Sequence, residues 1–136
     1  MPTDAHDDAR PLAQRFADAL LVLEHSASTE QLVELYADGC AVGNVVSGES
    51  HHGRDGAASF WSAYRDQFDT VTSTYRLVAG DDNGAVLEWE TSATANDRQV
   101  DYRGATVLQF DGDRIARSMA YFDPAALGRQ VIGTDD

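Results

Sequence analysis

The sequence predicts a single α+β domain in which helices pack over the concave face of a curved antiparallel sheet. Amphipathic helical patterns occupy the first half of the chain, and long alternating strands separated by short turns follow them. The chain has 136 residues, close to the usual size of one domain. We therefore expect residues 10–132 to form the domain, preceded by an acidic tail over residues 1–9 and followed by a short tail over residues 133–136.

Three helices are expected before the long strands. Over residues 11–26, apolar side chains recur every three or four positions, as on one face of a helix. The segment from Ser28 to Glu30 offers a cap for a short second helix over residues 30–37. The third helix, over residues 55–68, carries an aromatic stripe of the kind that usually packs in a core, namely Phe60, Trp61, Tyr64 and Phe68.

One short strand and four long ones are expected around the third helix. The short strand covers residues 40–47, with Gly43 loosening its middle, and a turn-rich link over residues 48–53 follows it. A terminal helix over residues 123–131 closes the chain. The long strands are expected over residues 71–79, 85–95, 100–110 and 114–122, joined by turns rich in Asp, Asn and Gly.

Alternation along the long strands separates an inner face from an outer face, because successive side chains point to opposite sides. The side expected to face inward carries Leu87, Trp89, Thr91 and Ala93. In the next strand, Arg103 has the opposite parity to Thr106 and Leu108. Arg103 is therefore interpreted as an outer-face partner of Glu88 or Glu90 and not as a catalytic cation.

The charge of the chain excludes several classes of partner. Its formal net charge is −13 and its pI is about 4.4, so nucleic acid and anionic membranes would be repelled. All ten basic residues are Arg and Asp outnumbers Glu, a bias that suggests a GC-rich or salt-adapted host. The first residues lack the basic and apolar regions of a secretory signal, and the apolar run Ala19–Leu23 is too short to span a bilayer. A cytoplasmic location is expected.

Cysteine and histidine usage does not predict a metal or redox site. Cys40 lies beside Ala41 and Val42, where a thiol is expected to pack as a small apolar group. His51 and His52 are adjacent on an extended segment, so they point to opposite faces and chelation by both is not expected. We interpret them as exposed turn residues, with His52 at the rim of a pocket as the alternative. No metal-ligand spacing or phosphate-binding Gly-rich loop is present, and no cofactor is expected.

Three segments resemble the NTF2-like superfamily, and within it the SnoaL-like branch. They are LYADGC over residues 35–40, GRDGAASFW over residues 53–61, and FDGDRIARSMAYFDPAAL over residues 110–127. The resemblance covers about Leu12 to Val131. It implies a cone in which long helices close over a bent sheet and leave an apolar pocket, and it implies a homodimer formed through the sheet. Relatives include ketosteroid isomerases, limonene epoxide hydrolases, polyketide cyclases and non-catalytic proteins, so the fold alone does not define the activity.

The residues that react in these relatives are mostly replaced here. A ketosteroid isomerase requires a carboxylate base and two acidic hydrogen-bond donors, and the matching positions hold Asn44, Phe16 and Thr106. An amide is a very weak base and a phenyl ring donates no hydrogen bond, so enolisation by that mechanism is not expected. In polyketide cyclases of the SnoaL type a pocket aspartate acts as acid or base, and Asp123 is the residue nearest that role. Asp before Pro is also a common helix cap, which is the alternative for Asp123.

The limonene epoxide hydrolase set is also incomplete. Its Asp-Arg-Asp positions correspond to Thr91, Trp89 and Ala120, and its tyrosine corresponds to Val42. Only its asparagine remains, as Asn44. The resemblance therefore predicts the pocket more firmly than any of the reactions known for the superfamily.

The sequence thus predicts a mostly apolar pocket for a small hydrophobic molecule that carries one or two oxygens. Two hypotheses remain open: an isomerase, cyclase or hydrolase in which Asp123, Tyr64 or His52 carries a proton, and a non-catalytic ligand-binding or dimerisation module. Asn44, Thr91, Thr106 and Ser118 would orient the ligand. The full set expected to line the pocket is Phe16, Leu20, Asn44, Phe60, Tyr64, Trp89, Thr91, Thr106, Leu108, Ser118 and Phe122.

Overall fold

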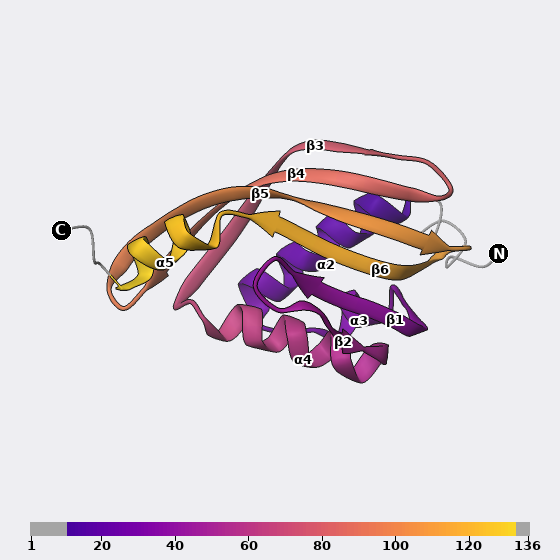
Figure 1. Ribbon diagram of the computed structural model, residues 1–136, viewed down its shortest axis with the longest axis horizontal. Helices are drawn as coiled ribbons and strands as arrows, with labels where there is room; N and C mark the ends of the chain where they lie inside the picture. Colours follow the sequence, from indigo (N-terminus) through magenta and orange to yellow (C-terminus); the bar gives the residue numbers. More distant parts are fainter. Residues whose placement is uncertain (1–10, 133–136) are drawn as a thin grey trace.

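A computed structural model describes residues 11–132, and in it helices cover one side of a curved, open sheet (Figure 1). The predicted acidic tail and the last four residues lie outside the described part. The helices are α2 (Leu12–Ser26), α3 (Glu30–Val33), α4 (Gly53–Asp66) and α5 (Pro124–Ile132). The strands are β1 (Tyr36–Asn44), β2 (Gly48–His52), β3 (Thr70–Gly80), β4 (Gly84–Ala95), β5 (Arg98–Asp111) and β6 (Arg114–Phe122). This is the predicted α+β class, with helices over one side of a curved sheet.

The sheet has the strand order β2-β1-β6-β5-β4-β3. Strands β3 to β6 form an antiparallel meander in which each strand pairs with the next one in the chain. Strand β1 joins that meander by pairing parallel with β6, and β2 then pairs antiparallel with β1 at the edge. Helices α2 and α4 pack against β3 and β1 respectively, so the inner face of the sheet is covered by segments from the first half of the chain.

The predicted division of the strands into two faces is confirmed. Leu87, Thr91 and Ala93 have at most 2% of their surface exposed, and Trp89 has 8%. Arg103 is exposed on the outer face, as expected, and lies opposite Glu90 in the β4–β5 pairing. The ion pair formed by Glu90 is with Arg76 on the other neighbouring strand, at 2.8 Å.

Several boundaries in the first half differ from the sequence predictions, and the pairing of β1 with its neighbouring strands accounts for them. The second helix ends at Val33, because the Leu35 carbonyl already accepts a hydrogen bond from the Ile115 amide of β6 and the chain continues as a strand. No side-chain hydrogen bond caps α3, although the sequence offered one. The link over residues 48–53 is mostly strand β2, which pairs with β1.

The turn between β1 and β2 explains why the first strand ends at Asn44 and not at residue 47. The Asn44 side-chain oxygen accepts hydrogen bonds from the Val46 and Ser47 amides at 2.8 and 2.9 Å, which folds the chain back locally. The sequence analysis expected Gly43 to loosen the strand, but its role is to let the Gly48 backbone pack closely against β1. A Cβ atom at residue 43 would lie 1.7 Å from the Gly48 carbonyl oxygen.

A hydrogen-bonded group inside the core joins α4 to two strands. Tyr36 at the start of β1 is fully buried, and its hydroxyl lies 2.7 Å from the Ser118 hydroxyl of β6. The Trp61 indole N–H of α4 donates to the same oxygen at 3.0 Å. Burial raises the pKa of Tyr36, so the hydroxyl stays protonated and bridges the two partners.

Replacing Tyr36 with Phe is expected to destabilise the fold by about 1–2 kcal/mol, because the Trp61 N–H and the Ser118 hydroxyl lose a partner inside the core. Urea unfolding at neutral pH measures the change. Tyr121→Phe is the matched control, since the Tyr121 side chain is 43% exposed and should tolerate the same change within about 0.5 kcal/mol. Equal losses for the two variants would contradict a special role for the buried hydroxyl.

Candidate functional site

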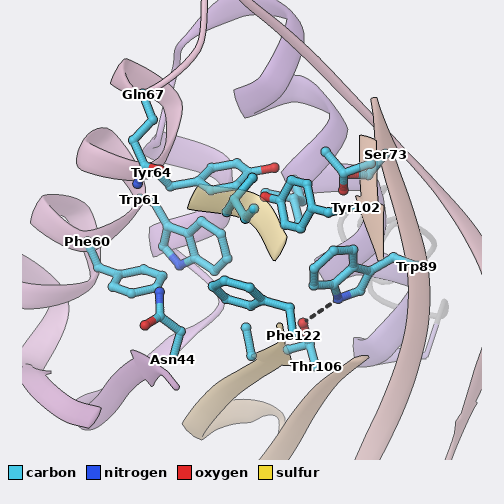
Figure 2. Close-up of a pocket in the computed structure, with 14 residues that line it drawn as sticks. Asn44, Phe60, Trp61, Tyr64, Gln67, Ser73, Trp89, Tyr102, Thr106 and Phe122 are labelled. Atoms are coloured by element: carbon cyan, nitrogen blue, oxygen red, sulfur yellow. Dashed lines mark hydrogen bonds between the residues drawn. The ribbon is translucent and has the colours of Figure 1, made fainter. Parts of the chain in front are cut away.

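A narrow cavity of about 60 Å³ lies between α4 and the inner face of β3 to β6. By this measure a single water molecule needs about 10–15 Å³, so the cavity has space for a few non-hydrogen atoms. Figure 2 shows aromatic rings on several sides of it. Its lining consists of Leu20, Asn44, Phe60, Trp61, Tyr64, Gln67, Ser73, Trp89, Thr91, Tyr102, Thr106, Ala120, Phe122 and Leu127.

Two groups of rings form the apolar walls. On the sheet, the ring centroid of Tyr102 lies 5.4 Å from that of Trp89 and 5.7 Å from that of Phe122, in edge-to-face contacts. On α4, the centroid of Trp61 lies 5.0 Å from Phe60 and 5.4 Å from Tyr64. Such edge-to-face contacts are favourable and hold the rings in fixed orientations. The walls of the cavity are therefore built by side chains that lock one another.

A wider groove of about 450 Å³ adjoins the inner cavity and shares several lining residues with it, among them Asn44, Tyr64 and Phe122. The groove is bordered by the β1–β2 turn, by α4 and by the first turn of α5. A ligand too large for the inner cavity would extend into this groove. The site is thus a funnel that narrows from the surface toward the sheet.

A buried carboxylate lies behind the inner end of the cavity. Glu24 of α2 has 1% of its surface exposed. The Tyr64 hydroxyl donates to its Oε2 atom at 2.7 Å, and the Ser73 hydroxyl donates to the same atom at 2.6 Å. The Ser73 amide donates to Oε1 at 2.8 Å, and the Ser73 hydroxyl also lies 2.7 Å from that of Thr91. We refer to Glu24, Tyr64, Ser73 and Thr91 as the Glu24 cluster.

The tyrosines around this cluster are strongly biased toward the neutral form. Burial raises the pKa of Tyr64 well above its ordinary value, and the nearby Tyr102 and Glu24 raise it further. Burial is also the main reason why the pKa values of Tyr75 and Tyr102 are raised, again with a contribution from Glu24. The Tyr75 hydroxyl is buried and has no hydrogen-bond partner among residues 11–132. These phenols therefore act as hydrogen-bonding groups and not as anions at neutral pH.

The structure brings most of the sequence-predicted pocket residues together. Those that line the inner cavity are Leu20, Asn44, Phe60, Tyr64, Trp89, Thr91, Thr106 and Phe122. Phe16, Leu108 and Ser118 do not line it. They are buried in the packed core at 0%, 1% and 2% exposure, and the Ser118 hydroxyl is held by Tyr36. The alternation along the strands identified the buried side chains correctly. It could not show which of them line the cavity and which pack against other side chains in the core.

Two of the three predicted proton carriers lie outside the cavity lining. Asp123 is exposed, and its Oδ1 atom accepts hydrogen bonds from the Ala125 and Ala126 amides at the start of α5, at 3.0 and 3.2 Å. It is a helix cap, which was the alternative interpretation. His52 is also exposed, whereas His51 packs edge-to-face on Phe60 and borders the outer groove. Tyr64 alone of the three lines the cavity.

The sequence analysis missed Glu24, Ser73 and Tyr102 as site residues. Glu24 follows Leu20 by four positions on the buried face of α2, where a carboxylate is unusual enough to have been a signal. Ser73 shares the inward parity of Val71 on β3. Tyr102 shares that of Thr106 on β5. A polar residue with buried parity beside other polar residues on neighbouring elements is the pattern that could have identified the cluster.

Residues 11–132 contain no cluster of three His, Cys, Asp or Glu side chains arranged to bind a metal ion. Within the same range, no helix is both long and apolar enough to cross a bilayer. Cys40 packs in the core, as predicted, and burial raises the pKa of its thiol.

Comparison with protein families gives one match, to the SnoaL-like domain over residues 13–118. This range covers nearly all of α2, the whole of α3 and α4, strands β1 to β5 and the first half of β6, and it includes the Glu24 cluster. Helix α5 lies outside it. No curated protein matches the sequence.

Solved structures with the same fold include proteins of different description. An NTF2-like protein from Anabaena variabilis matches with a TM-score of 0.75 at 14% identity, covering 82% of this chain and 87% of that one. An LEH-like epoxide hydrolase from M. tuberculosis matches with a TM-score of 0.69 at 17% identity, covering 90% of both chains. A protein of ketosteroid isomerase-like fold from Catenulispora acidiphila, in complex with trimethylamine, matches with a TM-score of 0.74 at 14% identity, covering 85% and 91%. At these identities the similarity shows the fold and not the reaction.

Proposed function

Because the chain belongs to the SnoaL-like domain family, whose fold it adopts, we propose that its funnel binds a small, mainly apolar molecule carrying one or two oxygen atoms. The observation that carries the proposal is the combination of aromatic walls with the Glu24 cluster at the inner end. A pocket with apolar walls and a few convergent polar groups is the usual form of a small-molecule site. The walls would bury the body of the ligand, and the polar groups would fix its orientation.

The enzymatic form of this proposal is an isomerase, cyclase or hydrolase that uses Tyr64 and Glu24. Tyr64 lines the cavity and its hydroxyl is hydrogen-bonded to a buried carboxylate, which is a geometry suited to moving a proton between the ligand and the protein. Among the structural neighbours, the M. tuberculosis protein is an epoxide hydrolase, so the fold supports chemistry on small oxygen-bearing molecules in that case.

The alternative is a non-catalytic ligand-binding module. It is favoured by the residues at the positions where ketosteroid isomerases hold their base and donors, since Phe16 is core here and the Asn44 oxygen is used by its own turn. Turnover of a bound molecule that is lost in Tyr64→Phe would establish the enzyme. Tight binding without turnover of any epoxide, ketone or enol in a broad panel would establish the binding module.

Ligand binding can be detected directly, because both tryptophans of the chain, Trp61 and Trp89, line the cavity. We expect their fluorescence to change when a small alicyclic alcohol, ketone or epoxide binds. Ala120→Leu should fill the cavity and lower the affinity at least about tenfold while the fold is retained. Ala79→Leu is the matched control, because residue 79 is exposed on β3 and its enlargement should leave binding unchanged. No response to any member of the panel, or equal binding by both variants, would contradict the proposal.

A further inference from the structure

We propose that the inner end of the cavity is a hydrogen-bond acceptor site set by Glu24, so that its ligand must place a donor there, a hydroxyl or an N–H group. This inference rests on the proposed function and specifies which polar group of the ligand enters first. It follows from the direction of each hydrogen bond in the Glu24 cluster.

The carboxylate of Glu24 fixes the direction of two hydroxyl protons. The Tyr64 and Ser73 hydroxyls both donate to its Oε2 atom, at 2.7 and 2.6 Å. The Ser73 amide, which can only donate, occupies Oε1 at 2.8 Å. Within residues 11–132, Tyr64 and Ser73 are the recorded hydrogen-bond partners of this carboxylate. The proton of each phenol or hydroxyl therefore points toward Glu24 and away from the cavity.

Thr91 and Tyr102 must also donate their hydroxyl protons to other members of this hydrogen-bonded group. Ser73 has one hydroxyl proton, which it gives to Glu24, so in its 2.7 Å contact with Thr91 the threonine must donate. Figure 2 shows the hydroxyl groups of Tyr64 and Tyr102 turned toward one another. Tyr102 is hydrogen-bonded to Tyr64, and because the Tyr64 proton is already given to Glu24, Tyr102 is the donor in this bond. Thr91, Tyr64 and Tyr102 all line the cavity. Because their protons are given to one another and to Glu24, what these groups can offer a ligand there is an oxygen lone pair.

Two other polar groups of the cavity lining, Thr106 and Asn44, have the opposite character. Thr106 accepts a hydrogen bond from the Trp89 indole N–H at 3.0 Å, drawn in Figure 2, so its own proton remains free to donate. The Asn44 oxygen is occupied by the Val46 and Ser47 amides, so the group that remains for a ligand is the amide N–H₂, again a donor. The lining therefore has acceptors at the Glu24 cluster and donors away from it, at Thr106 on the sheet and at Asn44 beside the outer groove. A molecule with a hydroxyl at one end and a carbonyl or ether oxygen at the other fits this arrangement.

The test compares cyclohexanol with cyclohexanone, two probes of similar size of which only the alcohol can donate. Binding is followed by NMR through the Trp89 indole N–H resonance. For the natural protein we expect the alcohol to bind about tenfold more tightly. The ketone has no proton to donate, so its oxygen would face the acceptor oxygens of the cluster without a hydrogen bond.

Glu24→Gln is the decisive variant, because an amide reverses the polarity of the cluster. The Gln oxygen can still accept from the Ser73 amide, while its N–H₂ group donates to Tyr64 and Ser73 and releases their protons toward the cavity. The ratio of the affinity for the alcohol to the affinity for the ketone should fall from about ten to one or below, because the ketone binds more tightly to this variant. Glu88→Gln makes the same chemical change on the exposed outer face and should leave the ratio unchanged.

A gain of affinity for the ketone cannot arise from a damaged fold, which separates this result from simple destabilisation. Ser73→Ala provides a second variant, because it frees the Thr91 proton and should shift the ratio in the same direction. Equal affinities of the two probes for the natural protein, or an unchanged ratio in Glu24→Gln, would overturn the inference while the proposed function stands. Failure of either probe to bind at the Trp89 resonance, together with failure of the wider panel, would overturn both.

Discussion

Alanine at residue 43 is expected to destabilise the protein by about 3 kcal/mol and to lower its Tm by about 10 °C. The added Cβ would lie 1.7 Å from the Gly48 carbonyl oxygen and 2.6 Å from its carbon, and both are backbone atoms that no side-chain rotation can move aside. The β1–β2 turn would have to shift as a unit. Because Asn44 follows directly and borders the funnel, the same variant should also weaken ligand binding.

Gly39→Ala is the control for this prediction, since residue 39 lies in the same strand and a Cβ there meets no atom within 4 Å. It should change the free energy of unfolding by no more than about 0.5 kcal/mol. Thermal and urea unfolding of the two variants measure the difference. If Gly43→Ala were as stable as Gly39→Ala, the close approach of β1 to the turn would not constrain this position.

Alkaline pH is expected to unfold the protein in a narrow range above the ordinary pKa of tyrosine. Four tyrosines, Tyr36, Tyr64, Tyr75 and Tyr102, have pKa values raised mainly by burial. Below about pH 10 both the folded and the unfolded chain keep these protons, so the folded state loses no stability. Above it the unfolded chain releases them while the folded chain does not, and each group lowers the free energy of unfolding by about 1.4 kcal/mol per pH unit.

At about pH 11 the four groups together should lower the stability by about 5 kcal/mol, which is comparable to the total stability of many small domains. The near-ultraviolet absorbance of tyrosinate and the far-ultraviolet circular dichroism should therefore change together as pH rises. The chain unfolded in urea should ionise its tyrosines near pH 10 without any structural transition. Ionisation of all four tyrosines with the fold intact would contradict the burial of their hydroxyl groups.

The second half of the fold was predictable because its signals are local. The long strands alternate cleanly and are separated by Asp, Asn and Gly turns, so strand limits and inner faces agree with the structure to within a residue or two. The region around β1 and β2 was not predictable in the same way. There the chain leaves a helix at Val33 because β6, which lies at the far end of the sequence, pairs with Leu35. A hydrogen bond to so distant a partner has no signature in the nearby residues.

The part of the candidate site that lies on the long strands was predictable, because alternation along a strand shows which side chains face inward. Trp89, Thr91 and Thr106 follow from strand alternation, and they line the cavity. Glu24 could not be found by expecting apolar residues on buried helix faces, since its burial is made tolerable by Ser73 and Tyr64, which come from two other elements. The polar end of the site is a tertiary feature, and its residues acquire their roles only once three elements meet.

The parallel pairing of β1 with β6 also bears on the order in which the molecule is built. The meander of β3 to β6 consists of strands that are neighbours in the chain, and such contacts form with little loop-closure entropy. Strand β1 is made early during synthesis but has no partner in the meander until β6, near the end of the chain, has emerged. The mouth of the funnel, which β1 helps to form, should therefore be among the last parts to assemble. A nascent chain would carry an open sheet edge until then, and it would acquire a ligand site only once β6 has paired with β1.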